Sequence, residues 1–292
     1  MKNYVPAVFL LLLTFGIGPA ARADGRPNGA HWVGTWTTAP VPQPPSANYS
    51  VGFKDQTLRQ IVKVSLGGSE LRLRLSNTFG TKKVQVGTVR VGLRDKGPAI
   101  KDGSNRAVTF GGATSVTLWP GAVTLSDPIK LDVPALAELA VSIYLPGEVP
   151  ASLPITYHGI AKQTNYISPS GDHTAQVEMP VEATKLSWYF LTGIDVVAPQ
   201  GVGAVVALGD SLTDANLSSA DTNSRWTDAL AAKLHADGVQ MGVINQGTGG
   251  GRLLSDVVGD GAHGRPRGGI RVHRQEEPAR RQRFDIPQSH EP

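Results

Sequence analysis

Two short apolar runs in the second half of the chain flank one stretch with helical spacing. The first run covers Ala204 to Leu208, and the second covers Val239 to Ile244. A short apolar run bounded by glycine is typical of a buried strand in a parallel sheet. Between the runs, apolar side chains recur at an interval of four, and Asp237-Gly238 offers a helix stop. The apolar positions are Trp226, Leu230 and Leu234. This pattern predicts a strand, a helix and a second strand.

The chain from residue 24 to residue 200 has a different pattern. Leu71, Leu73 and Leu75 alternate with Arg72 and Arg74, which is the period of a half-buried strand. Gly-rich and Pro-rich turn signals separate further short apolar runs, at 84–93, 107–110, 115–118, 129–133, 139–145 and 188–197. Many short strands at this spacing predict an all-β amino-terminal domain, a sandwich or jelly roll. The segment 198–201 is the expected joint between this domain and the strand–helix–strand unit.

The first 23 residues have the pattern of a secretory signal peptide. Lys2 supplies a positive start, residues 7–17 are apolar, and Ala21-Arg22-Ala23 is a small-residue cleavage site. The apolar stretch is too short to span a bilayer, and an uncleaved anchor is the alternative. We therefore expect cleavage after Ala23, a secreted or periplasmic protein, and no stable membrane insertion.

Candidate chemistry lies where the two predicted strands end. The first is followed by Gly209-Asp210-Ser211-Leu212, and the second by a glycine-rich stretch from Asn245 to Gly251. Active sites of open α/β sheets lie at the carboxyl ends of strands. A serine there can act as a nucleophile if a base lies within hydrogen-bond reach. The alternative is that Ser211 only caps the following helix.

Together these stretches resemble the first two sequence blocks of the SGNH, or GDSL, family of serine esterases and lipases. The second block is Asn245-x-Gly247-x-Gly249-Gly250. Three upstream stretches resemble the amino-terminal β-domain of secreted bacterial members: 32–40, 71–80 and 163–166. The resemblance covers about Trp32 to Leu254. It implies that residues 201–258 begin a three-layer α/β/α hydrolase domain, following the β-domain of residues 24–200.

The resemblance also implies roles for particular residues. Ser211 is the expected nucleophile, and its backbone N–H and that of Gly250 are expected to form the oxyanion hole. Asp210 and Asp214 are expected to hold the turn. The remaining motif residues are Gly209, Leu212, Asn245 and Gly247. The implied reaction is hydrolysis of carboxylic esters, acylated polysaccharide among them, through an acyl-enzyme without metal or cofactor.

Two further sequence blocks of the family are not found at their expected positions in this chain. The chain contains no Asn-Asp dipeptide, so the Gly-x-Asn-Asp block that supplies a third oxyanion donor is absent. An Asp-x-x-His string occurs at Asp260 to His263, which makes His263 a candidate base, but the family places this block far beyond the glycine block. We therefore expect this chain to have little or no activity.

The composition changes near Val258. Residues 259–292 are dominated by Gly, Arg and Pro without apolar periodicity, which predicts a disordered segment. Truncation or a frameshift after the second block explains both this change and the missing blocks. A basic tail that binds nucleic acid or membrane is the alternative, but acidic residues are interleaved with the arginines.

A carbohydrate-binding module without catalysis is the competing function. Its candidate aromatic residues are Trp32, Trp36, Trp119 and Trp188, for which we expect packing in the core instead. The isolated histidines His31, His158 and His173 are expected at the surface or satisfied in the core. The chain has no cysteine, and its net charge of +4 indicates no nucleic-acid partner. The sequence does not set an oligomeric state.

Overall fold

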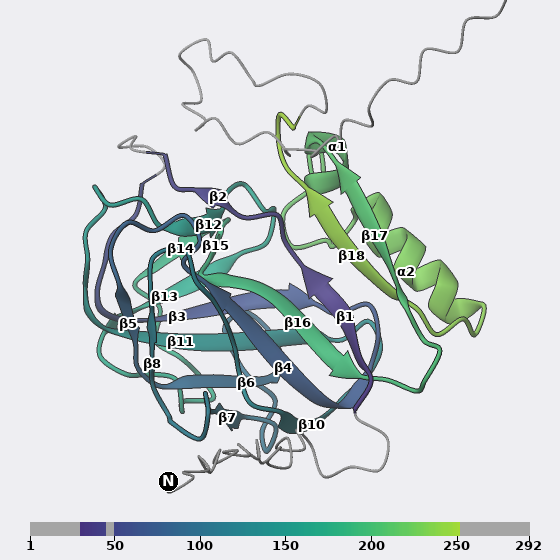
Figure 1. The fold of residues 1–292 in the computed structure, drawn as a ribbon, viewed down its shortest axis with the longest axis horizontal. Coiled ribbons are helices and arrows are strands. Elements are labelled where there is room, and N and C mark those ends of the chain that lie inside the picture. The colour runs from purple at the N-terminus through teal and green to yellow at the C-terminus, as the bar shows by residue number, and fades with distance from the viewer. Residues whose placement is uncertain (1–29, 45–49, 252–292) are drawn as a thin grey trace, which may run out of the picture.

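The computed structural model describes residues 30–44 and 50–251, and these form a β-rich fold with several antiparallel sheets (Figure 1). The β-rich part of the prediction is confirmed. The predicted signal peptide, His263 and the segment 259–292 lie outside the described residues. No helix in the described part of the chain is long and apolar enough to cross a membrane.

Two larger sheets account for most of the strands. The five-stranded sheet contains β1 (Trp32–Thr37), β16 (Leu191–Val197), β4 (Gly68–Ser76), β10 (Ile129–Val133) and β9 (Val123–Leu125). The six-stranded sheet contains β14 (Ala183–Lys185), β13 (Asn165–Ser170), β3 (Phe53–Lys63), β11 (Glu138–Val149), β6 (Val89–Leu93) and β7 (Arg106–Val108).

Three smaller sheets complete the described part. One contains β15 (Trp188–Tyr189), β12 (Thr156–His158) and β2 (Val41–Pro42), and another pairs β5 (Val84–Val86) with β8 (Val116–Leu118). The third is parallel and pairs β17 (Ala204–Gly209) with β18 (Gly242–Gly247). The helices are α1 (Ser211–Asp214) and α2 (Trp226–Ala236).

One hydrophobic core joins the two larger sheets. Leu71, Leu73 and Leu75 of β4 are fully buried in it, together with apolar side chains of β3, β6 and β11. The arginines between these leucines face the other way, and Arg72 and Arg74 form ion pairs with Asp195 at 2.9 and 3.3 Å. The alternation in the sequence therefore correctly predicted this strand and its buried face.

The central strand β3 was not predicted from the sequence. Arg59 in this strand is fully buried, and its guanidinium donates to three backbone carbonyls at 2.7 to 3.0 Å, those of Pro98, Gln176 and Val177. Its Nε also donates to Ser142 Oγ at 2.9 Å. Burial lowers the pKa of Arg59 to about 10. Buried polar residues of this kind interrupt the apolar pattern by which a strand is recognised.

The predicted strand–helix–strand unit is confirmed, with two corrections in detail. The first correction is that the second strand begins at Gly242 and not at Val239. The helix α2 ends before Asp237 and Gly238, as predicted. The buried residues of α2 are Thr227 and Ala231, whereas Trp226 is 48% exposed. The helix is therefore rotated from the apolar face that its sequence suggested, because it packs its small residues against β18.

The prediction of a buried first strand is wrong. Val206 and Leu208 of β17 are 53% and 63% exposed, because β17 pairs only with β18 among the described strands. In contrast, β18 lies against β1, and a Cβ atom added at Gly242 would lie 2.2 Å from the Gly34 carbonyl oxygen. The parallel pair thus rests on the β-rich part through β18 and β1, as Figure 1 shows.

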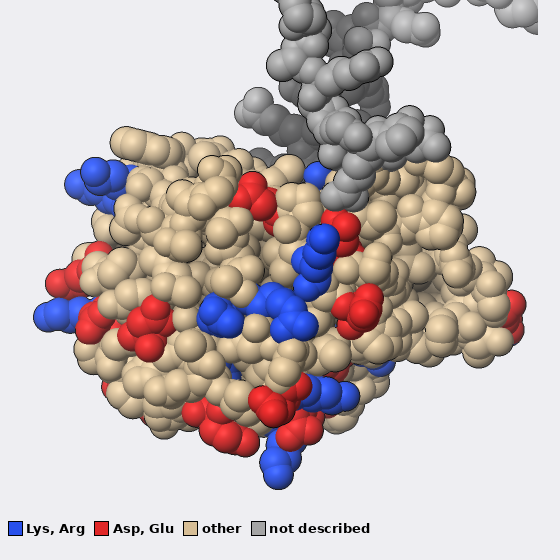
Figure 2. Space-filling view, turned by 90° about the horizontal axis from the view of Figure 1, so that it is seen from below, with Lys and Arg blue, Asp and Glu red and all other residues tan. Residues whose placement is uncertain are grey.

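Charged side chains of both signs are visible on the surface. On the face that Figure 2 shows, Lys and Arg side chains lie among Asp and Glu side chains. One ion pair in the described part, Lys233 with Asp237 at 2.5 Å, is largely exposed. Such exposed pairs contribute little to stability because water screens them.

Candidate functional site

The Gly209–Leu212 turn joins β17 to α1. Asp210 is the N-cap of α1, and its Oδ1 accepts a hydrogen bond from the Leu212 N–H at 3.0 Å. Ser211 is the first residue of the helix and is half-buried, so the alternative in which Ser211 caps the helix is wrong. Among the described residues, the Ser211 hydroxyl has no hydrogen-bond partner. Leu212 is 65% exposed.

The glycine-rich turn lies beside it at the same end of the parallel sheet. The strand register pairs Gly209 with Gly247, so both turns begin at the same level. The Thr248 N–H donates to the Gly209 carbonyl at 3.0 Å. Gly250 has a φ of +73°, a left-handed conformation that favours glycine. Strand pairing therefore brings together two motifs that lie more than 30 residues apart in the sequence.

Both strand-end glycines are required by the close approach of α1. A Cβ atom added at Gly247 would lie 2.3 Å from the Asp214 nitrogen. A Cβ atom added at Gly209 would lie 2.2 Å from Thr213 Oγ1. A Cβ atom does not come this close to a non-bonded atom in real structures, so a side chain at either glycine would force α1 or the strand to shift.

Asn245 fastens both helices to the sheet. Its Nδ2 donates to the Thr213 carbonyl at 2.6 Å and to Thr227 Oγ1 at 3.1 Å, and its Oδ1 accepts from the Gly247 N–H at 2.7 Å. This side chain therefore contacts α1, α2 and the start of the glycine turn. It shapes the site and does not point a free polar group into it.

Asp214, the last residue of α1, lies between the glycine turn and a histidine from the β-rich part. Its Oδ1 lies 2.7 Å from His158 Nε2, and its Oδ2 accepts from the Gly249 N–H at 3.2 Å. His158 is 4% exposed, and its Nδ1 lies 2.7 Å from the Ala39 carbonyl oxygen. Burial by itself lowers the pKa of His158, but the charge and hydrogen bond of Asp214 and the carbonyl of Ala39 outweigh it, so the pKa is raised.

Arg225, just before α2, ties the same elements together. Its Nε donates to the Asp214 carbonyl at 3.0 Å, and its Nη2 donates to the Ala161 carbonyl. Its Nη1 forms an ion pair with Asp228 at 3.2 Å. The guanidinium also lies over the Trp188 ring, 5.8 Å from its centroid. A single side chain thus links α1, α2 and the β-rich part.

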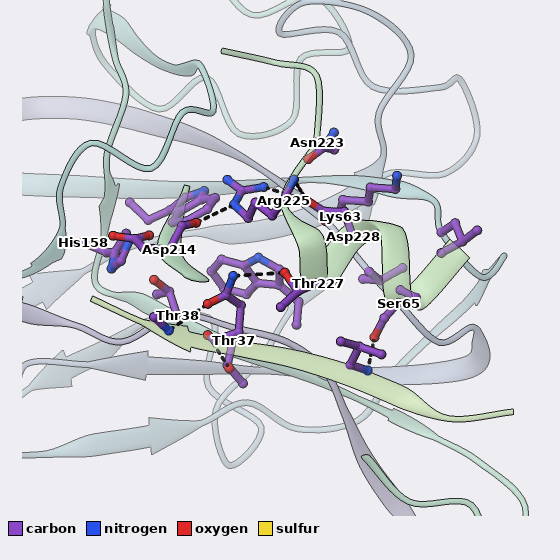
Figure 3. Close-up of a pocket in the computed structure, with 18 residues that line it drawn as sticks. Thr37, Thr38, Lys63, Ser65, His158, Asp214, Asn223, Arg225, Thr227 and Asp228 are labelled. Carbon is purple, nitrogen blue, oxygen red and sulfur yellow. Dashed lines mark hydrogen bonds and ion pairs between the residues drawn. The ribbon is translucent and has the colours of Figure 1, made fainter. Parts of the chain in front are cut away.

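A pocket lies between β1, the end of β3 and α2 (Figure 3). His158, Asp214 and Arg225 line it on one side, and Lys63 and Asp228 lie further along it. Ser211 is not among its lining residues. The described residues contain no group of His, Cys, Asp and Glu side chains that could hold a metal ion.

Neither a scan against protein-family models nor a search of curated proteins finds a match for this chain. We therefore infer function from the geometry of the two turns. That geometry is a half-buried serine at a tight strand-to-helix turn, with a left-handed glycine turn next to it.

His158 was not assigned to this site from the sequence. We expected it at the surface or satisfied in the core, and the structure shows a buried residue bonded to Asp214. The two residues lie 56 positions apart, and no motif spacing connects them. His31 binds the Val202 carbonyl at 2.6 Å, away from these turns. His263 lies outside the described residues.

Proposed function

We propose that the chain carries the nucleophile turn and the oxyanion turn of an exported serine ester hydrolase of the SGNH, or GDSL, type. The supporting observation is the register of Gly209 with Gly247, because it brings Ser211 and the Gly250 turn to one end of the sheet. In this proposal, β17, β18 and the two helices are the beginning of a three-layer α/β/α domain. The β-rich part before them is its sandwich-like amino-terminal domain.

The proposed chemistry is acyl transfer without metal or cofactor. Ser211 Oγ attacks the carbonyl carbon of a carboxylic ester, the alcohol leaves, and water later releases the acid from the acyl-enzyme. The backbone N–H groups of Ser211 and Gly250 donate to the developing oxyanion. Donors fixed on tight turns need little reorganisation as charge develops. Acylated polysaccharide is the substrate class that suits an exported enzyme of this kind.

We further propose that this chain turns over esters slowly or not at all. None of the described histidines, which are His31, His158, His173 and His235, hydrogen-bonds Ser211. Both ring nitrogens of His158 already have partners. In a comparable serine enzyme, loss of the histidine base costs about a million-fold in rate. Without a base, acylation of Ser211 is slow, and deacylation is slow as well.

Acetylation by p-nitrophenyl acetate tests this proposal. A trapped acyl group should accumulate on Ser211 and be found by peptide mass spectrometry of the full chain. The matched control is Ser218, another half-buried serine of the same loop region. We expect acetylation at Ser211 to exceed that at Ser218 at least tenfold, and steady-state release of p-nitrophenol to equal that of Ser211→Ala.

Two outcomes would contradict the proposal in different ways. Equal acetylation of Ser211 and Ser218 would show that the turn does not favour acyl transfer, and the serine hydrolase proposal would fall. Sustained turnover that Ser211→Ala abolishes would confirm the chemistry and overturn the claim of low activity.

Glycan binding by the β-rich part is a second candidate function, which one residue supports. Trp36 and Trp188 are buried, at 8% and 5% exposure, and form an edge-to-face pair, as expected for core packing. Trp119 differs because it is 60% exposed, with Lys83 Nζ 5.7 Å from its ring centroid. Exposed aromatic rings stack on sugars, and nearby polar groups bind hydroxyls.

A pull-down of the full chain on insoluble polysaccharides tests this candidate. Retention that Trp119→Ala removes would support it, with Trp226→Ala as the control because Trp226 is also about half exposed. Equal retention of all three proteins, or no retention of any, would remove the support that Trp119 provides.

A further inference from the structure

We infer that His158 is a positioning residue for the proposed oxyanion turn: as an imidazolium it holds the Asp214 carboxylate, which in turn holds the Gly249 N–H next to Gly250. This inference rests on the proposed function, because it concerns the regulation of the same turn. It links a histidine of the β-rich part to a backbone donor of the parallel unit through one carboxylate.

The protonation state follows from the two partners of the ring. A backbone carbonyl can only accept a hydrogen bond, and an ionised carboxylate can only accept as well. The Ala39 carbonyl lies 2.7 Å from Nδ1, and Asp214 Oδ1 lies 2.7 Å from Nε2. A neutral imidazole carries a hydrogen on one nitrogen only, so it can satisfy just one of these contacts. The imidazolium satisfies both.

The charged groups around His158 agree with this assignment. Asp214 from α1 raises the pKa of His158, and Arg225 from the segment before α2 opposes it more weakly. Arg225 itself is held by Asp228 and by two backbone carbonyls. From β15, the uncharged Trp188 ring packs against the imidazole at 5.6 Å between centroids, and burial raises the pKa of its neighbour Tyr189 to about 12, so that phenol is neutral too.

A change in the protonation of His158 affects the glycine turn through Asp214, because the Asp214 side chain has little freedom to move. Its Oδ1 and Oδ2 are used in opposite directions, toward His158 and toward Gly249. Its backbone lies so close to Gly247 that the site has no room for a Cβ atom. When His158 loses a proton, one of its two hydrogen bonds is lost. Whichever hydrogen bond is lost, the ring also loses its positive charge, so the Asp214 carboxylate is held less firmly on the side of the β-rich part.

The direction of the pH dependence follows from the raised pKa. The pKa of His158 in the folded chain lies above its ordinary value of 6.5. The stabilisation that protonated His158 gives through Asp214 is therefore fully present below the pKa of this histidine in the unfolded chain. It is lost as the pH rises through the pKa of His158 in the folded chain. We expect an ordered Gly249–Gly250 turn at acidic and neutral pH and a looser one at higher pH.

Nuclear magnetic resonance of the isotope-labelled full chain tests the inference. We expect the His158 ring to show two protonated nitrogens at low pH, and the amide shifts of Gly249 and Gly250 to titrate with the same midpoint as the ring. In His158→Gln, which cannot titrate, this shared midpoint should vanish. In His173→Gln, the control at a half-buried histidine that contacts neither Asp214 nor the glycine turn, it should remain.

A second variant covers the case in which His158→Gln does not fold. In Asp214→Asn, the midpoint of the His158 ring should fall, and the Gly249 amide should no longer follow it. Amide shifts of Gly249 and Gly250 that stay constant while the ring titrates, or a neutral ring below pH 6.5, would overturn the inference. Acetylation of Ser211 is measured separately, so coupled shifts without acetylation would overturn the proposed function alone.

Discussion

Asn245 Nδ2 donates to the Thr213 carbonyl at 2.6 Å, which joins the middle of β18 to the short helix that begins with Ser211. A four-residue helix has little stability of its own, because most of its backbone groups have no partner within the helix. Its position therefore depends on side chains from other elements. Asn245 and Arg225 provide these contacts, because they donate to the carbonyls of Thr213 and Asp214.

Replacing Asn245 tests how strongly this contact holds the site. Asn245→Ala removes two donated hydrogen bonds and one accepted bond, and it leaves the Thr213 carbonyl without this partner. We expect a loss of about 2–3 kcal/mol in the free energy of unfolding, measured by urea titration. The exposed Asn216→Ala is the control and should change it by less than about 0.5 kcal/mol. Equal values for the two variants would contradict this role.

Gly247 should not tolerate a side chain. Gly247→Ala places a methyl group where only 2.3 Å separates it from the Asp214 nitrogen, so α1 or β18 must shift. We expect destabilisation of about 1–3 kcal/mol, seen as a lower melting temperature. In Gly203→Ala the new methyl group meets no atom within 4 Å, so this variant should melt like the parent chain. An unchanged melting temperature for Gly247→Ala would show that α1 packs less tightly than described.

Arg59 should be among the most sensitive residues of the β-rich part. Arg59→Met keeps much of the buried volume but leaves the carbonyls of Pro98, Gln176 and Val177 without this donor. Losing several hydrogen bonds from one buried charged side chain should cost more than about 3 kcal/mol together, measured by chemical unfolding. The control is Arg106→Met, because the exposed Arg106 side chain makes a single hydrogen bond among the described residues, to the Gly103 carbonyl. A smaller effect for Arg59 than for Arg106 would refute this role of Arg59 in β3.

Asp127 should contribute to stability in a pH-dependent way. Hydrogen bonds from the Thr109 hydroxyl and the N–H groups of Gly112 and Gly111 lower the pKa of Asp127 below its ordinary 3.8. A lowered folded pKa gives stabilisation that is present above pH 3.8 and is lost as the pH falls through the folded value.

The variant Asp127→Asn checks this pH dependence. Its melting temperature should lie below that of the parent at pH 7, and the difference should narrow as the pH falls below 3.8. The exposed Asp132→Asn should follow the parent at every pH. A constant difference across this range would mean that the charge of Asp127 is not what stabilises the loop.

Some features were predictable because the sequence pattern and the burial agree. In β4, leucines and arginines alternate, and the leucines are buried while the arginines face away. The order of the strand–helix–strand unit was predictable from its apolar runs, four-residue spacing and Gly238 stop, although the buried faces of β17 and α2 differ from those predicted. The placement of Ser211 after β17 followed from the same local pattern.

Other features were decided only by the tertiary structure. The strand β3 escaped prediction because Arg59 and Gln60 are buried by partners that lie far away in the sequence. The exposure of β17 depends on which strands pair with it, and no local pattern contains that information. The contact of His158 with Asp214 arises because β18 rests on β1, which brings α1 to β12 across 56 residues. Local periodicity specifies strands and helices, whereas the partners of a buried polar group are set by how distant elements pack.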